Sequence, residues 1–202
     1  VSLMIYILKN ALLIQLAGFL LLAIDFIPRF GWKKGTWFSL FHAVSAFGNA
    51  GFDLFGDSLV GFQQNPWVLS IISGLIISGG LGFLVWSDVL SYKSVRRISL
   101  HSKIALIVTA TLLIFGTLGF MLTEGNAASL AEGNVIHRFF NTIFMSVTPR
   151  TAGFFSVDYA SMTHAGLLLT IILMFIGGTS GSTAGGFKTT TFGILIIKLV
   201  CI

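Results

Sequence analysis

The chain has 202 residues, of which 55% are hydrophobic and only 9% are charged. A water-soluble domain carries about 25% charged residues, so this composition excludes an ordinary soluble enzyme or binding domain and is typical of an integral membrane protein. The net charge of +5 does not indicate nucleic-acid binding, because the lysines and arginines are scattered between apolar runs rather than gathered on one polar face.

The first half of the chain is expected to contain a membrane span, a short helix, a glycine turn and a second span. Residues 1–24 and residues 66–86 are mainly apolar, and both reach the length of about 20 residues that a spanning helix needs. Residues 36–47 are apolar and aromatic but too short to span. This short segment ends at the turn Gly48-Asn49-Ala50-Gly51-Phe52.

The second half follows the same order but ends differently. Residues 104–122 are long enough to span, residues 132–147 form the short segment, and the turn Arg150-Thr151-Ala152-Gly153-Phe154 follows. A short apolar run at 165–176 then meets a stretch with five glycines before apolar residues resume at 192–202. Glycines disfavour a continuous helix, and backbone groups released in a membrane need partners in protein or water. We therefore predict a broken helix.

An offset of 102 residues aligns the two halves. At this offset identical residues meet at several positions: Phe38 and Phe140, Ala50 and Ala152, Gly51 and Gly153, Phe52 and Phe154, Ser78 and Ser180, Gly79 and Gly181. These identities are few, but the shared order of elements indicates an old internal duplication, as in many transport proteins. We predict two pore repeats, residues 1–97 and residues 98–202.

The loop between the second and third spans is expected to face the cytoplasm. Residues 87–103 contain a single acidic residue, Asp88, and four basic residues, Lys93, Arg96, Arg97 and Lys103. Positively charged loops stay on the cytoplasmic side of a membrane. Both glycine turns then enter the membrane from outside, as a shared pore requires.

The two glycine turns have the composition of a cation-selectivity filter. A pore that selects a bare cation replaces its hydration shell with oxygen atoms, and backbone carbonyls do so without adding fixed charge. Glycine accepts strained backbone geometry, and a short helix ending at the turn directs the negative end of its dipole at the ion. The alternative is a plain turn between membrane segments. The candidate filter residues are Gly48, Asn49, Ala50, Gly51, Arg150, Thr151, Ala152 and Gly153.

Three motifs resemble the Trk/Ktr/HKT superfamily of potassium transporters. Residues 45–52 and 148–154 resemble its filter loops, and residues 177–192 are similar to its intramembrane gating loop. The run Ser78-Gly79-Gly80-Leu81-Gly82-Phe83 is similar to a glycine motif in the last helix of the second repeat. The resemblance covers essentially the whole chain and is strongest to the bacterial Ktr-type membrane subunit.

This resemblance implies an all-α integral membrane protein of the bacterial cell membrane, with four repeats of helix, re-entrant pore helix and helix around one pore. The chain matches the second and third repeats. It also begins and ends within apolar runs, so we expect a piece of a longer protein that does not conduct alone. The carbonyls of Asn49, Ala50, Thr151 and Ala152 are then expected to bind K+. The implied gating loop, below the filter, comprises Gly177, Gly178, Thr179, Ser180, Gly181, Ser182, Thr183, Ala184, Gly185, Gly186 and Lys188.

The implied function is potassium uptake, and the sequence leaves open whether Na+ is coupled to it. The implied partners are membrane lipid, a second copy of the chain and a cytoplasmic ring of nucleotide-binding regulatory subunits; no organic cofactor is expected. Residues 93–103 either contact that ring or face anionic lipid head groups. A membrane scaffold and a membrane-embedded enzyme stay open as alternatives. However, the spans carry almost no ionisable residues, and a scaffold does not explain the glycine turns.

Several charged residues have two interpretations. Lys188 either tunes ion passage or binds an acidic group, or else it extends toward the cytoplasm, because a cation buried in a membrane is costly. Arg150 is expected to turn away from the pore and brace the filter, since a cation facing the ion path repels K+. Asp53, Asp57 and Asp158 follow the turns, and they either concentrate cations at the outer mouth or are solvated loop residues.

Overall fold

The computed structural model describes residues 2–95, 98–125, 130 and 134–200, and its regular structure is helical. The only pairing of β type within these residues is an isolated bridge between Ile176 and Phe187. The all-α prediction is therefore confirmed. In chain order the elements are α1 (Ser2–Phe30), α2 (Trp32–Phe47), η1 (Val60–Phe62), α3 (Pro66–Val95), α4 (Leu100–Glu124), α5 (Val135–Val147), η3 (Tyr159–Ser161), α6 (His164–Phe175) and α7 (Thr189–Val200).

Helices α1, α3 and α4 are long and apolar enough to cross a membrane, over Met4–Phe30, Pro66–Ser91 and Leu100–Glu124. They confirm the three predicted spans. One face of α1 and one of α4 expose large apolar side chains, among them Leu12, Leu16, Leu20 and Ile24 on α1 and Ile107, Ile114, Leu118 and Leu122 on α4. Contiguous apolar surface of this extent is unfavourable in water and is stable against lipid. The three spans and this apolar surface make the chain a multi-pass membrane protein.

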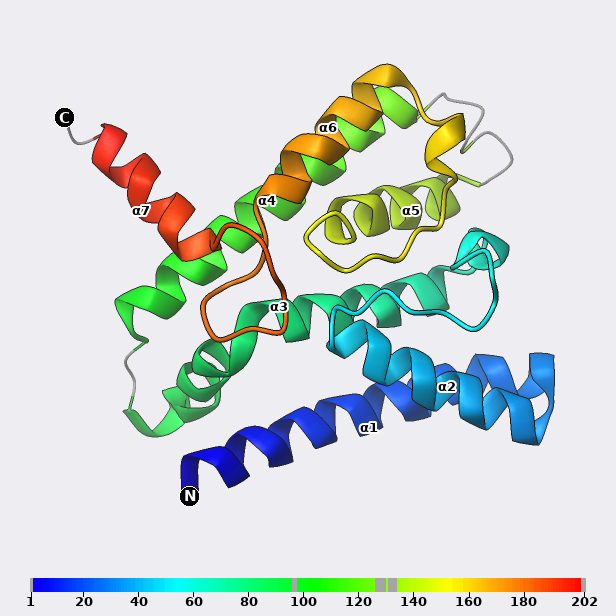
Figure 1. The fold of residues 1–202 in the computed structure, drawn as a ribbon, viewed down its shortest axis with the longest axis horizontal. Helices are drawn as coiled ribbons and strands as arrows, with labels where there is room; N and C mark the ends of the chain where they lie inside the picture. The colour runs from blue at the N-terminus through cyan, green and yellow to red at the C-terminus, as the bar shows by residue number, and fades with distance from the viewer. Residues whose placement is uncertain (1, 96–97, 126–129, 131–133, 201–202) are drawn as a thin grey trace.

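Helix α2 folds back along α1 in a tight hairpin. The connection turns at Gly31, whose φ is 80°. Gly35 then lies so close to α1 that a methyl group there would come within 2.6 Å of the Phe26 carbonyl oxygen. This hairpin carries the end of α2 to the centre of the molecule (Figure 1). Helices α2 and α5 are the two short helices predicted from residues 36–47 and 132–147.

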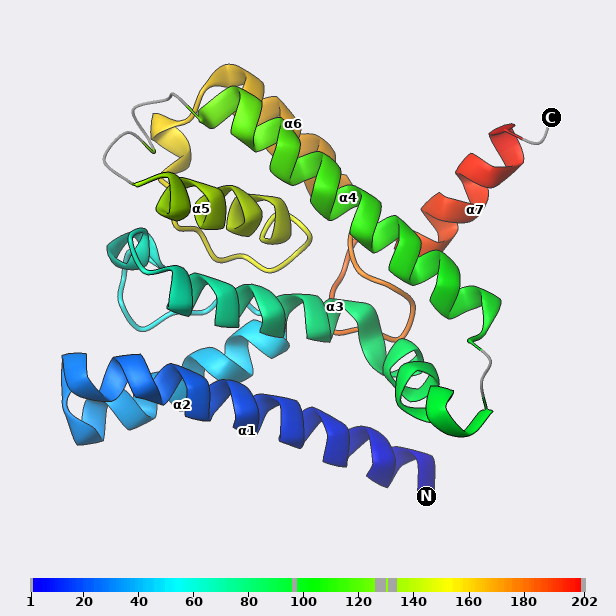
Figure 2. The ribbon, with the colours of Figure 1, turned by 180° about the vertical axis from the view of Figure 1, so that it is seen from behind.

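Both short helices end in the central region, on either side of α3 (Figures 1 and 2). The start of α1, the end of α7 and the start of α4 lie toward one end of the molecule. The loops that follow α2 and α5 run from the central region toward the opposite end. This arrangement is the one expected if both turns enter from the same side. Arg96 and Arg97 of the predicted cytoplasmic loop lie outside the described residues.

The main hydrophobic core joins the two halves of the chain. It combines residues of α1, α2 and α3 with Phe144 and Val147 of α5 and with Phe154, which follows the second turn. Phe26, Phe144 and Phe154 are almost completely buried in it. Packing across the halves therefore sets where the two turns lie relative to each other.

Two helices are interrupted at the level of the turns. The predicted broken helix is confirmed, because residues 177–188 separate α6 from α7 without helical structure. Helix α3 also bends, at Gly82, whose φ of 74° and ψ of 165° are not helical. The sequence predicted residues 66–86 as one uninterrupted span, so this bend is a finding of the structure.

Candidate functional site

The two glycine turns have the same pattern of backbone conformation. Asn49 and Gly51 have φ values of 49° and 71°, and Thr151 and Gly153, each 102 residues later, have values of 65° and 82°. Asparagine tolerates positive φ, whereas a β-branched residue such as threonine rarely adopts it. Positive φ at alternate residues turns successive carbonyl groups toward the same side of the chain. The aligned turns thus share the feature that a carbonyl-lined ion path needs.

A hydroxyl group at the end of each short helix fastens the turn. In the first turn, the hydroxyl of Ser45 donates to the carbonyl of Phe52 at 2.7 Å. In the second, the hydroxyl of Thr148 donates to the carbonyl of Phe154. Each bond ties the helix end to the segment that leaves the turn, so the residues between them are held as a closed loop.

Four backbone oxygens are expected to bind K+, and no described residue donates a hydrogen bond to them. Within the described part of the chain, no donor bonds to the carbonyls of Asn49, Ala50, Thr151 or Ala152. All four residues line one hollow of about 430 Å³, together with Gly153, Thr148, Pro149, Tyr159 and Met174. Burial raises the pKa of Tyr159 above its ordinary value, so this half-buried ring stays neutral near pH 7. Residues with such carbonyls, from two separate turns, therefore surround one hollow.

The broken helix packs into the bend of α3. When α3 leaves helical geometry at Gly82, the carbonyls just before the bend lose their partners within the helix, and in a membrane they need others. The broken helix supplies the donors. The N–H of Thr183 donates to the carbonyl of Gly79 at 3.3 Å, and Thr179 donates through its N–H to the carbonyl of Gly80 at 3.0 Å and through its hydroxyl to the carbonyl of Leu81. In return, the N–H of Phe83 donates to the carbonyl of Gly181 at 3.3 Å. The bend of α3 and the broken helix thus provide hydrogen-bond partners for each other's backbone groups.

Sequence reasoning did not assign this role to Gly82. The signal was present, because Gly82 lies in the quoted glycine motif of residues 78–83, but three further glycines in the same predicted span gave no reason to select it. The bend also places residues 177–188 below both turns, where Thr183 and Gly185 contact them.

Lys188 closes the broken helix on itself. Its ammonium group donates to the Ala184 carbonyl at 2.9 Å, and the side chain is half-buried. The N–H of Gly177 donates to the carbonyl of Phe187 at 3.0 Å, which joins the two ends of the segment. The group that Lys188 contacts is therefore a backbone carbonyl and not the acidic side chain considered from the sequence.

Arg150 turns away from the hollow, as expected from its charge. Its guanidinium is buried and donates to the hydroxyl of Thr109 on α4 at 3.3 Å. It borders a small cavity with Ile76 of α3 and Gly178 of the broken helix. The second turn is thereby attached to α4 by a side chain that points away from the hollow.

Two of the three outer aspartates hold loop structure. Asp53 accepts hydrogen bonds from the N–H groups of Phe55 and Gly56 at 2.8 and 2.7 Å. Asp158 accepts one from the N–H of Ala160 at 3.0 Å and caps η3. Asp57 is exposed. For Asp53 and Asp158 the structure favours a role in the turns of the outer loops.

His42 supports the first turn from behind. It is fully buried in α2, and its Nδ1 lies 2.7 Å from the carbonyl of Phe38. Its ring stacks on Phe55 with 4.4 Å between the ring centroids, and its Nε2 accepts from the N–H of Leu54 at 3.4 Å. The histidine therefore fixes the segment that leaves the first turn.

Comparison with known proteins places the chain among membrane cation transporters. The TrkH model, described as a cation transport protein, matches residues 1–200. The potassium/sodium uptake protein NtpJ of Enterococcus hirae is 61% identical over 98% of the chain, and the Ktr system potassium uptake protein B of Bacillus subtilis is 40% identical over 93%. The chain spans 44% and 42% of the lengths of these two proteins.

The fold has a counterpart among solved structures. The crystal structure of the potassium transporter TrkH from Vibrio parahaemolyticus aligns with a TM-score of 0.70 at 18% identity. The alignment covers 95% of this chain and 40% of that protein. At this identity the match demonstrates a shared fold.

Proposed function

Because this chain belongs to the TrkH family of cation transport proteins, we propose that it supplies two segments of the selectivity filter of a potassium pore. The observation that carries the proposal is the set of free carbonyls at Asn49, Ala50, Thr151 and Ala152, which belong to residues around one hollow. Carbonyl oxygens can replace the hydration shell of K+. The C-terminal ends of α2 and α5 add the negative ends of two helix dipoles.

The proposed transported ion is K+. Two relatives are named for potassium/sodium uptake and for potassium uptake, which supports K+ as the ion of this pore. Na+ is the second ion of the proposal, as either a coupled or a competing ion. Uptake takes place across the cell membrane, and its partners in the proposal are a second copy of the chain and a cytoplasmic ring of nucleotide-binding subunits.

The proposed pore needs more chain than these 202 residues. Residues 1–97 and 98–202 are proposed as two adjacent repeats, each with a long helix, a short helix, a turn and an interrupted helix. This division is supported by the positive φ values that recur at an offset of 102 residues. Two further repeats would close the filter, in keeping with the 44% of NtpJ that the chain spans. Residues 177–188, which lie below the turns, form the proposed gate.

The proposal is tested by a substitution of Gly153 in the complete transporter. Cells that lack other potassium uptake would express the parent, Gly153→Ser or Gly61→Ser, and the initial rates of Rb+ and Na+ uptake would be compared. Gly153 has a φ of 82° and touches the first turn, whereas a side chain at the exposed Gly61 meets no atom within 4 Å. We expect Gly153→Ser to lose the preference for K+ over Na+ and Gly61→Ser to keep it. An unchanged preference in Gly153→Ser would refute the filter.

A further inference from the structure

The broken helix contacts both glycine turns through side chains at equivalent positions. Asn49 and Thr151 lie 102 residues apart, and both have positive φ. The amide of Asn49 donates to the hydroxyl of Thr183 at 2.7 Å. The hydroxyl of Thr151 accepts from the N–H of Gly185 at 3.1 Å. One loop is thus attached to the two turns at matching points.

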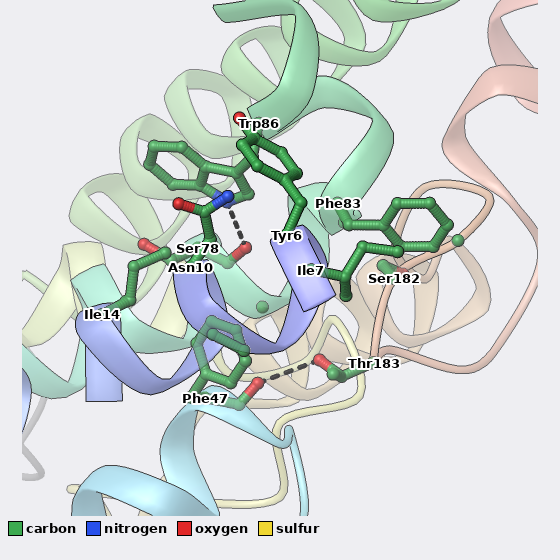
Figure 3. Close-up of a pocket in the computed structure, with 14 residues that line it drawn as sticks. Tyr6, Ile7, Asn10, Ile14, Phe47, Ser78, Phe83, Trp86, Ser182 and Thr183 are labelled. Atoms are coloured by element: carbon green, nitrogen blue, oxygen red, sulfur yellow. Dashed lines mark hydrogen bonds between the residues drawn. The ribbon is translucent and has the colours of Figure 1, made fainter. Parts of the chain in front are cut away.

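Thr183 makes a second bond, to the end of the first short helix. Its hydroxyl donates to the carbonyl of Phe47, the last residue of α2, at 2.9 Å (Figure 3). This carbonyl belongs to the negative end of the helix dipole, which attracts cations. With the loop in this position, a hydroxyl proton occupies a lone pair that would otherwise be available to a cation or to its hydration water.

These contacts differ from those that hold the loop to α3. The bonds to α3 go to backbone carbonyls beside the Gly82 bend, and most of their donors are backbone N–H groups. The bonds to the turns depend on the side chains of Asn49, Thr151 and Thr183. Thr183 and Gly185 are also exposed, while Ala184 between them is buried. The loop therefore has a fixed side toward α3 and a side toward the turns that can be released.

We infer that Asn49 and Thr151 latch the gate: their side chains hold Thr183 and Gly185 beneath the filter, and the loop moves aside only when these bonds break. This inference rests on the proposed function and adds a second role to two filter residues. Their carbonyls serve the ion path, whereas their side chains position the gate. When the loop is released, the equivalent residues Asn49 and Thr151 lose their hydrogen bonds to it together. The movement of the gate is thereby coupled to the lower edge of the filter.

The test uses the complete transporter in proteoliposomes, with Rb+ uptake normalised to the amount of reconstituted protein. Thr183→Val keeps the shape of the side chain and removes its bonds to Asn49 of the first turn and to Phe47 at the end of α2. Since one hydrogen bond changes an equilibrium by roughly two- to tenfold, we expect resting Rb+ uptake to rise by about that factor, with an unchanged ratio of Rb+ to Na+. Thr183→Ser, which retains the hydroxyl, should restore the slow rate. Thr111→Val, at an exposed position on α4 outside the turns and the broken helix, is the matched control and should leave the rate unchanged.

A second variant keeps the inference testable if Thr183→Val does not fold. Thr151→Val removes the acceptor for Gly185 and leaves Thr183 intact, and it too should raise resting uptake. Rates equal to or below the parent rate, in whichever of the two variants reconstitutes with the parent melting temperature, would overturn the latch. The ion preference of Gly153→Ser tests the filter independently of the latch. If the latch variants do not raise resting uptake but Gly153→Ser loses its preference for K+ over Na+, the latch is rejected and the proposed function is retained.

Discussion

Gly51 and Gly153 lie back to back at the contact between the two turns. A methyl group on Gly51 would be 2.8 Å from the Cα atom of Gly153, and one on Gly153 would be 3.0 Å from the Cα atom of Gly51. Both residues also have positive φ, 71° and 82°. Side chains are therefore excluded at both positions by space and by backbone conformation. The contact fixes the distance between two turns from different halves of the chain.

Gly51→Ala is expected to destabilise the chain and to impair transport. The left-handed conformation costs alanine about 1–2 kcal/mol, and the forced contact with Gly153 adds about 1–3 kcal/mol. Thermal unfolding of the purified chain in detergent would measure the loss, and Rb+ uptake by the complete transporter should fall at least about tenfold. Gly61→Ala, where no atom lies within 4 Å, should match the parent in both measurements. Equal melting temperatures for the two variants would contradict the contact.

Two glycines of α3 should respond in opposite ways to the same substitution. A methyl group on Gly79 would lie 2.0 Å from the carbonyl oxygen of Phe47, so Gly79→Ala should destabilise the chain by about 1–3 kcal/mol. A methyl group on Gly74 meets nothing within 4 Å, and Gly74→Ala should be neutral or stabilise the helix by about 0.5–1 kcal/mol. Melting temperatures decide the matter. A Gly79→Ala variant as stable as Gly74→Ala would show that α2 does not end against α3.

Thr109→Val is expected to loosen the second turn through Arg150. The substitution keeps the side-chain shape but removes the hydroxyl that accepts from the buried guanidinium. A buried charged donor that loses a partner costs about 1–3 kcal/mol. Thr111→Val, at an exposed position on the same helix, is the matched control and should stay within about 0.5 kcal/mol of the parent. If both variants melt at the same temperature, Arg150 does not depend on α4.

The role of Asp53 can be separated into charge and hydrogen bonding. Asp53→Asn keeps a side-chain oxygen that can accept from the N–H groups of Phe55 and Gly56, while Asp53→Ala removes it. If the residue serves the turn, the melting temperature and Rb+ uptake of the asparagine variant should stay near the parent values, and both should fall in the alanine variant. Equal losses of uptake in the two variants, greatest at low ionic strength, would instead show that the carboxylate attracts cations to the outer mouth.

Much of the fold follows from local properties of the sequence. Apolar runs of sufficient length predicted the three spans, and five glycines between apolar runs predicted the break between α6 and α7. The bend of α3 was not predictable in this way. Gly74 and Gly82 lie in the same helix, yet only Gly82 leaves helical geometry. The carbonyls released there accept hydrogen bonds from a loop about 100 residues further along the chain.

The candidate site likewise has features that are visible in the sequence and contacts that only the structure shows. The recurrence of two glycine turns after short helices is visible in the sequence, as is the electrostatic reason for Arg150 to face away from a cation path. Its acceptor, Thr109, is 41 residues away and has no distinguishing pattern. For Asp53 the sequence allows a cation-attracting role but favours a loop role, and its two backbone partners support the loop role.

The sequence by itself determined the membrane class, the order of helices and turns, and the segments that form the two glycine turns and the broken helix. Those properties depend on the length and hydropathy of continuous segments, which are local. Only the tertiary structure decided that Gly51 meets Gly153 and that Asn49 reaches Thr183 across 134 residues of chain. The sequence contains 23 glycines and many hydroxyl side chains, so it does not indicate which of them meet. The packing of α1, α2, α3 and α5 into one core determines which residues meet.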